Sequence, residues 1–169
     1  MKQTEGDGRV AINPVGAAHV SALANLHDSL FPDAPWNAAS FKELLAHPGA
    51  VAFVARAGRP RAVIGFVVGR LAADEAEILT LGVARDRQRD GIGSLLLETF
   101  CRAVRVRGAS QLHLEVAAGN TAARAFYDRF GFRERGRRAG YYAQAGAPAA
   151  DAINLGLSLA FPWRHGGRP

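Results

Sequence analysis

Cysteine is almost absent from this sequence, and so is any long apolar run. Cys101 is the single cysteine, so no disulfide forms within the chain, which favours a protein of a reducing compartment. The best apolar run, Ala62–Gly69, is flanked by arginines and falls far short of the about 20 residues that a membrane-spanning helix needs. Residues Met1–Arg9 carry Glu5 and Asp7 and lack the apolar stretch of a secretory signal. These absences predict a soluble, cytoplasmic protein with no membrane partner.

Lysine is also scarce. Lys2 and Lys42 are the only lysines among 21 basic residues, and 15 acidic residues leave a formal net charge of +6. Arginine favours bidentate contacts with phosphate or carboxylate groups, although a GC-rich genome would produce the same bias. The charge leaves nucleic acid, a membrane surface and a small polyanion open as partners and does not choose among them.

The rest of the composition is that of an ordinary globular domain. Apolar residues make up 49% and charged residues 21%, which excludes a disordered chain. A length of 169 residues suits one core, so a single domain over 1–169 is expected. Three weakly patterned segments are expected to be loose, namely 1–8, 143–150 and 164–169.

Hydrophobic periodicity predicts a mixture of helices and strands. The clearest helix is Gly91–Arg107, with one apolar stripe formed by Ile92, Leu95, Leu96, Thr99, Ala103 and Val106. Further helices are expected at 17–30, 37–46 and 121–129, and strands at 9–13, 51–57, 61–71, 75–84, 110–116, 132–138 and 151–160. This order is typical of an α/β or α+β arrangement and not of a repeated βαβ unit.

The most informative segment is Gln88–Gly93, which joins a predicted strand to the clearest helix. Glycines at such a junction let phosphate oxygens approach backbone N–H groups, and the helix N-terminus adds about half a positive charge. The segment lacks the lysine of a Walker loop, and Leu96 stands where a dinucleotide fingerprint has its third glycine. A pyrophosphate site is therefore one interpretation, and a plain glycine-containing helix start is the other.

The Gln-x-x-Gly-x-Gly pattern of this segment, between a strand and a long helix, resembles motif A of the GNAT family of acetyl-CoA-dependent N-acetyltransferases. The likeness continues through Leu112 with Glu115–Val116, Asn120, Ala125–Tyr127 and Phe130–Phe132. Within the family the chain most resembles the RimI-type bacterial ribosomal-protein alanine acetyltransferases, through Pro35–Trp36 with Phe41, Glu77–Leu81, Glu115, Gly140–Tyr142 and Asp151–Ala152.

The resemblance implies a mixed central sheet of about seven strands, with helices on both faces and a splayed parallel pair at Ile78–Val83 and Gln111–Val116. Acetyl-CoA would lie in this gap as the co-substrate, and no metal is implied. The residues that the resemblance assigns to acetyl-CoA are Leu81, Gly82, Val83, Arg89, Asp90, Gly91, Ile92, Gly93, Ser94 and Asn120. The N–H of Val83 would polarise the thioester carbonyl.

By the same resemblance Glu115 is the general base, acting directly or through a water, and Tyr127 is the acid for the departing thiolate. A neutral amine is needed, and about 10% of an N-terminal amine but under about 0.1% of a lysine is neutral at pH 7. Structural alternatives stay open: Glu115 as a solvated strand residue, Tyr127 as a boundary residue, Asn120 as a helix cap and His113 as a structural histidine.

The acceptor side is less defined. Trp36, Tyr141 and Tyr142 are candidate acceptor contacts, and each is equally well explained as an aromatic packing residue. The acceptor expected from the resemblance is the N-terminal α-amine of a protein, possibly a ribosomal protein. A lysine side chain or a small amine is the alternative. The strong positive charge does not suit a basic ribosomal terminus, which calls for an acidic groove.

A nucleic-acid or ribosome-binding protein is the third hypothesis. It rests on the arginine cluster Arg124, Arg129, Arg133, Arg135, Arg137 and Arg138. That segment lacks the interleaved aromatic residues of single-strand binders, and no groove-reading motif is present, so direct nucleic-acid binding is not expected.

Overall fold

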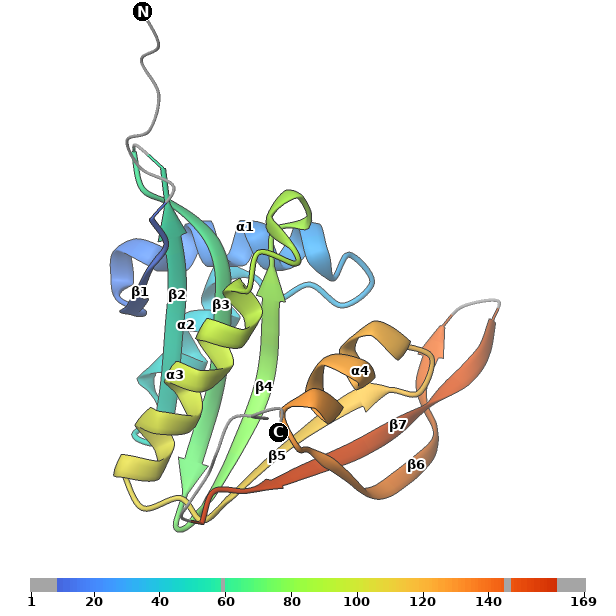
Figure 1. The fold of residues 1–169 in the computed structure, drawn as a ribbon. Helices are drawn as coiled ribbons and strands as arrows, with labels where there is room; N and C mark the ends of the chain where they lie inside the picture. Colours follow the sequence, from blue (N-terminus) through green and yellow to red (C-terminus); the bar gives the residue numbers. More distant parts are fainter. Residues whose placement is uncertain (1–8, 59, 145–146, 161–169) are drawn as a thin grey trace, which may run out of the picture.

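In the part of the chain that the structure describes, seven strands and four helices follow one another in the predicted order. A computed structural model describes residues 9–58, 60–144 and 147–160 (Figure 1). The strands are β1 (Ala11–Pro14), β2 (Ala50–Ala57), β3 (Ala62–Ala72), β4 (Glu75–Val83), β5 (Gln111–Ala117), β6 (Arg133–Gln144) and β7 (Ala147–Ser158). The helices are α1 (Val20–Leu30), α2 (Ala38–Ala46), α3 (Ile92–Val106) and α4 (Thr121–Arg129), with 3₁₀ turns at Ala17–His19 and Arg85–Arg87.

The strands form one mixed sheet in the order β1-β2-β3-β4-β5-β7-β6. The β4–β5 pair is parallel and every other neighbouring pair is antiparallel. The expectation of a seven-stranded mixed sheet with one parallel pair is confirmed. The parallel pair lies in the middle of the sheet, where the chain crosses over through α3.

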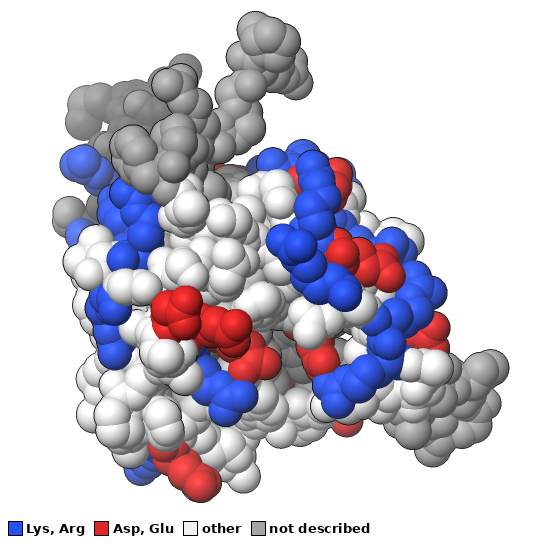
Figure 2. All heavy atoms as spheres, turned by 90° about the horizontal axis from the view of Figure 1, so that it is seen from below, with Lys and Arg blue, Asp and Glu red and all other residues white. Residues whose placement is uncertain are grey.

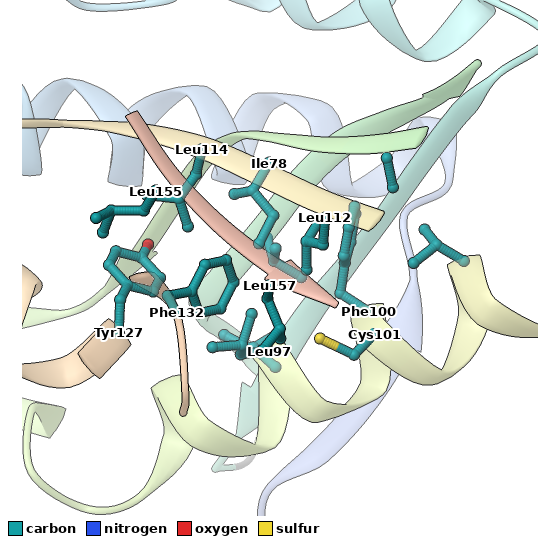
Figure 3. Close-up of a cluster of buried hydrophobic side chains, with 14 of the residues drawn as sticks. Ile78, Leu97, Phe100, Cys101, Leu112, Leu114, Tyr127, Phe132, Leu155 and Leu157 are labelled. Atoms are coloured by element: carbon teal, nitrogen blue, oxygen red, sulfur yellow. The ribbon is translucent and has the colours of Figure 1, made fainter. Parts of the chain in front are cut away.

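Helices cover both faces of the sheet, as expected. Helices α1 and α2 pack on one face of the β2–β4 half, in a small core around Leu23, Phe41 and Phe66. Helices α3 and α4 pack on the other face, where a larger core joins them to β5 and β7. In the close-up of that core, Leu97 and Phe100 of α3 lie under the strands (Figure 3).

The apolar stripe predicted for α3 is confirmed at Ile92 and Leu96 and is wrong at Leu95 and Val106. Leu95 is 40% exposed and Val106 is 82% exposed. The residues that α3 buries are Ile92, Leu96, Leu97, Phe100, Cys101 and Val104. Both sets have helical spacing, and the set that contains Phe100 places the larger apolar surface against the sheet, so that set decides the orientation.

The segment 143–150 was expected to be loose, and this is wrong for most of it. Strand β6 continues to Gln144 and β7 begins at Ala147, with Gln144 paired to Ala147. Small side chains do not prevent a hairpin, because its pairing uses backbone N–H and C=O groups. The expected loose ends 1–8 and 164–169 lie outside the described residues. Among the described helices, none combines the length and the apolar character needed to cross a membrane.

Candidate active site

Strands β4 and β5 begin as a pair and then separate. Their parallel register runs from Glu75 opposite Gln111 to Ile78 opposite Leu114. Beyond this point β4 continues to Val83 and β5 to Ala117 without pairing to each other, and the two ribbons diverge (Figure 1). The facing edges of both strands are therefore left with backbone groups that a ligand can bind.

Two hydrogen bonds show which backbone groups of β4 face this gap. The N–H of Ala84 donates to the carbonyl of Ile64 on β3, at 2.9 Å. The carbonyl of Val83 points the other way and accepts from the side-chain Nε2 of Gln88, at 3.1 Å. Because backbone direction alternates along a strand, the N–H groups of Leu81 and Val83 point toward the gap, whereas the backbone of Gly82 faces β3.

Gly82 serves a different purpose from its neighbours. A Cβ at this position would lie 2.7 Å from Cδ1 of Leu30 and 2.9 Å from the ring of Phe66. The missing side chain lets the end of α1 rest on the end of β4. Arg85 supports the same contact by donating to the carbonyl of Ser29, at 3.5 Å. The α1–α2 loop is thus held over the open end of the gap.

The turn before α3 has the geometry of an anion site. Arg89 and Gly91 both have positive φ, at 71° and 79°, and no side chain caps the N-terminus of α3. The first N–H groups of α3, on Ile92, Gly93 and Ser94, therefore have no side-chain acceptor from the cap residue, and a Cβ at Gly91 would meet nothing within 4 Å. These groups and the open space beside them fit a pyrophosphate. The Asp90 carboxylate is paired with Arg87, at 3.1 Å.

Asn120 caps α4, as one of the two interpretations predicted. Its Oδ1 accepts from the N–H of Ala123 at 3.1 Å, while the residue as a whole stays exposed. The cap fixes the start of the helix that carries Tyr127 and leaves the amide nitrogen of Asn120 available at the edge of the gap.

Tyr127 lies on the α3–α4 side of the sheet. It is 8% exposed, and its ring packs edge-on against Phe126 and Phe132, at centroid distances of 5.1 and 5.3 Å. Burial raises the pKa of its hydroxyl above the ordinary value. The hydroxyl is directed toward the strands that carry Leu114 and Leu155 (Figure 3). Tyr127 therefore keeps its proton throughout the neutral pH range.

Glu115 lies on the opposite side of the sheet. Its neighbours Leu114 and Val116 are buried in the core that contains Tyr127, so Glu115 points to the face that α3 and α4 do not cover. Its half-buried carboxylate accepts a hydrogen bond from Nη2 of Arg138 on β6. This bond raises the pKa of Arg138. Glu115 and Tyr127 thus approach the gap from its two faces.

The candidate acceptor residues come from two separate segments. Trp36, in the α1–α2 loop, is half-buried and stacks on His27, with centroids 5.2 Å apart. Tyr141 of β6 is 49% exposed and lies under the guanidinium of Arg138, at 4.0 Å. Tyr142 follows it in β6, opposite Ala150 of β7. Trp36 packs against the core under α1 and α2, and Tyr141 lies beside Arg138, which contacts Glu115.

Three residues of this region were not assigned a site role from the sequence. Gln88 was noted only as part of a motif, yet its amide holds Val83. His27 lies inside the helix predicted at 17–30 and carries no further signal in the sequence, yet it packs under the α1–α2 loop. Arg138 was counted only as part of a cluster. Its contact with Glu115 spans 23 residues, and no local pattern signals such a pair.

A protein-family model matches most of the described chain. A model described as the acetyltransferase (GNAT) family matches residues 20–132. The chain is 36% identical over 97 residues to the ribosomal protein bS18-alanine N-acetyltransferase of Escherichia coli K12. This alignment covers 57% of the chain and 62% of the relative, so less than two thirds of that protein is spanned.

A longer alignment exists with the N-alpha-acetyltransferase RimI of Mycobacterium tuberculosis H37Rv. It is 34% identical over 145 residues and covers 83% of this chain and 89% of the relative. Among solved structures, the ribosomal-protein-S18-alanine N-acetyltransferase of E. coli superposes with a TM-score of 0.79 at 27% identity, covering 89% of this chain and 94% of that one. NAA60 of Arabidopsis thaliana, at 21% identity, shares the fold with a TM-score of 0.77 over 89% of this chain and 99% of that one.

Proposed function

The chain belongs to the GNAT family of acetyltransferases, and on that basis we propose that it transfers the acetyl group of acetyl-CoA to the N-terminal α-amine of a protein. The observation that carries the proposal is the separation of β4 from β5 beyond Ile78 and Leu114, next to an uncapped α3. The extended arm of acetyl-CoA fits between the separated strands, and its pyrophosphate fits the N-terminus of α3.

On the donor side, acetyl-CoA supplies the activated acetyl group. The backbone of Leu81 and Val83 would pair with its extended arm, as one strand pairs with another. The turn from Arg89 to the first residues of α3 would hold the pyrophosphate through backbone N–H groups, and Asn120 would contact the arm from the α4 side. The side-chain amide of Gln88 binds the carbonyl of Val83, in the peptide unit that directly follows the N–H of Val83, and this contact holds the end of β4 in place.

On the acceptor side, Glu115 would take the proton of the attacking amine, directly or through a water. An N-terminal amine has an ordinary pKa near 8, so a modest base suffices at neutral pH. The N–H of Val83 would donate to the carbonyl oxygen as negative charge develops on it. Tyr127 would then protonate the departing thiolate from the other face, and its raised pKa means that the proton is present when needed.

The names of two relatives support a protein N-terminus as the acceptor. The E. coli relative is named for the alanine of ribosomal protein bS18 and the M. tuberculosis relative for N-alpha acetylation. A protein terminus fits a site whose acceptor side lies between the α1–α2 loop and β6, with Trp36 and Tyr141 beside it. More specifically, we propose that the protein whose N-terminus is acetylated is a ribosomal protein.

Two matched peptides test the function. One has a free N-terminal alanine and no lysine, and the other has a blocked N-terminus and one lysine. Each is incubated with acetyl-CoA and enzyme, and the product mass is measured. We expect acetylation of the first peptide alone, and its loss in Glu115→Gln. Acetylation of the second alone would show a lysine acetyltransferase, and CoA release with small amines but neither peptide would show a small-molecule enzyme.

A further inference from the structure

A cavity outside the candidate active site lies between α1 and the β2–β3 hairpin. Its volume is about 620 Å³, within the range of about 300–1,000 Å³ that is typical of small-molecule sites. Ala22 and Ala62 line it from the two elements, and their small side chains leave the space open. Because α1 packs on the face of the sheet opposite α3, this cavity is separate from the turn to which the pyrophosphate of acetyl-CoA is assigned.

Four of the residues that line this cavity can donate hydrogen bonds. Arg56, near the end of β2, and Arg61, directly before β3, contribute guanidinium groups. Asn25 contributes a side-chain amide from α1. The Nδ1 of His19 accepts from the N–H of Gly16 at 3.0 Å, so the Nε2 of the neutral imidazole carries the proton and can donate. Among the described residues that line the cavity, none is an aspartate or a glutamate.

The two arginines of the cavity form no ion pair with any described residue. Arg56 donates from Nη2 to the carbonyl of Arg61 at 3.3 Å, whereas its Nε is buried without a hydrogen-bond partner in the described structure. Other arginines are paired: Arg70 of the same hairpin lies 2.7 Å from Glu77. Seen from below, basic and acidic side chains alternate on the side formed by the β6–β7 hairpin (Figure 2). A buried N–H without an acceptor is costly, and an anion beside Arg56 would supply one.

We propose that this cavity binds a nucleoside monophosphate, as a ligand additional to acetyl-CoA. The terminal phosphate would lie between Arg56 and Arg61, whose two positive charges balance the about two negative charges of a phosphate monoester. A guanidinium binds phosphate oxygens through two parallel hydrogen bonds. The Nε2 of His19 and the amide of Asn25 supply further donors. The site lies apart from the acetyl-transfer machinery, so the proposal does not depend on which amine is acetylated.

The rest of the cavity favours a nucleotide over a bare phosphate or an RNA chain. The volume is many times that of a phosphate group, and Leu26 and Val63 present apolar surface beside the donors, against which a flat base can pack. Each phosphate along an RNA chain carries one charge, and proteins that bind single strands stack the bases on aromatic side chains. Among the described residues that line this cavity, none is a phenylalanine, tyrosine or tryptophan.

Calorimetric titration with AMP tests the proposal. Because AMP resembles part of acetyl-CoA, the full chain is first saturated with CoA, so that the donor site is filled. We expect one AMP to bind per chain, and we expect adenosine and inorganic phosphate to bind about 10-fold more weakly or less well still. Arg56→Gln and Arg61→Gln should each weaken AMP binding by about 10-fold or more, because each removes charge-assisted hydrogen bonds to the phosphate.

Arg70→Gln is the matched control, because it removes one positive charge from the same hairpin at a residue that pairs with Glu77. It should bind AMP as the wild type does. Arg61 is exposed, so Arg61→Gln should keep the thermal unfolding temperature and the acetyl-transfer rate of the wild type, and misfolding then cannot explain its loss of AMP.

Three results would each overturn the proposal and leave the acetyl-transfer function standing. They are no AMP binding to the CoA-saturated chain, binding of inorganic phosphate or adenosine as tight as that of AMP, and unchanged AMP binding in both Arg56→Gln and Arg61→Gln. An RNA oligonucleotide without a terminal phosphate provides a further test. If it binds more tightly than AMP and is lost in the same two variants, the cavity is a nucleic-acid site and the proposed nucleotide is wrong.

Discussion

The backbone N–H of Trp36 donates a hydrogen bond to Nδ1 of His27, at 3.2 Å, and the Trp36 ring stacks on the His27 ring. His27 is only 3% exposed and also contacts Phe31, Phe41 and Phe66. One buried histidine thus joins α1 to the loop that borders the acceptor side. Since Nδ1 accepts this bond, the imidazole is neutral in the folded protein, with its proton on Nε2.

His27 should make stability depend on pH. Burial lowers its pKa below the ordinary 6.5, and the charge of Asp28 opposes this only in part. Its contribution to the free energy of unfolding is complete above pH 6.5 and is lost as the pH falls through the lowered folded-state pKa, because the unfolded chain binds the proton more readily. Urea unfolding at pH 7 and pH 5 measures the loss. His27→Gln keeps an acceptor for Trp36 but does not titrate, so its loss should be smaller, and an equal loss in both proteins would contradict the assignment.

Tyr127→Phe should lower kcat by about 100-fold or more with little change in the Kd of acetyl-CoA. The ring contacts with Phe126 and Phe132 are kept, so the thermal unfolding temperature should change little. Single-turnover kinetics and calorimetric titration separate the two effects. Because the hydroxyl pKa is raised, any fall of wild-type kcat between pH 8 and pH 10 should arise from another group. An unchanged kcat in Tyr127→Phe would remove this residue from the mechanism.

Gly91→Glu should weaken acetyl-CoA binding by about 100-fold or more. The added carboxylate would stand where N–H groups of α3 are open to an anion, and like charges repel there. A Cβ at this position meets nothing within 4 Å, so the cost to folding is limited to about 1–2 kcal/mol for the positive φ. Gly91→Asn carries no charge and tolerates this φ, and it serves as the control. Calorimetric titration with acetyl-CoA measures both, and equal binding by Gly91→Glu and wild type would place the pyrophosphate elsewhere.

Local patterns predicted the parts of this fold that depend on short stretches of sequence. The seven strands, the parallel pair and the glycine turn before α3 all follow from periodicity, spacing and resemblance. The orientation of α3 did not, because two adjacent stripes are both apolar with helical spacing, and periodicity alone does not weigh the larger apolar area of the set that contains Phe100. The pairs Glu115–Arg138 and Trp36–His27 depend on how distant or looped segments meet, which no helical or strand period encodes.

Gly82 lies between Leu81 and Val83, whose N–H groups point to the gap, and its missing side chain makes room for the end of α1. Gly82→Ala would place a methyl group 2.7 Å from Leu30 and 2.9 Å from Phe66, which should lower the free energy of unfolding by about 1–3 kcal/mol.

Leu30→Ala removes one of the two clashing groups, so the double variant should lose less free energy than the sum of the single variants, with a coupling of about 1 kcal/mol in a double-mutant cycle. Gly93→Ala is the matched control. A Cβ there lies 3.6 Å from Phe126, an ordinary contact, and alanine is the better helix former, so its stability should be equal or higher. Additive losses of free energy for Gly82→Ala and Leu30→Ala would show that the end of α1 does not rest on β4 in solution. The α1–α2 loop would then lack the support that Gly82 gives it.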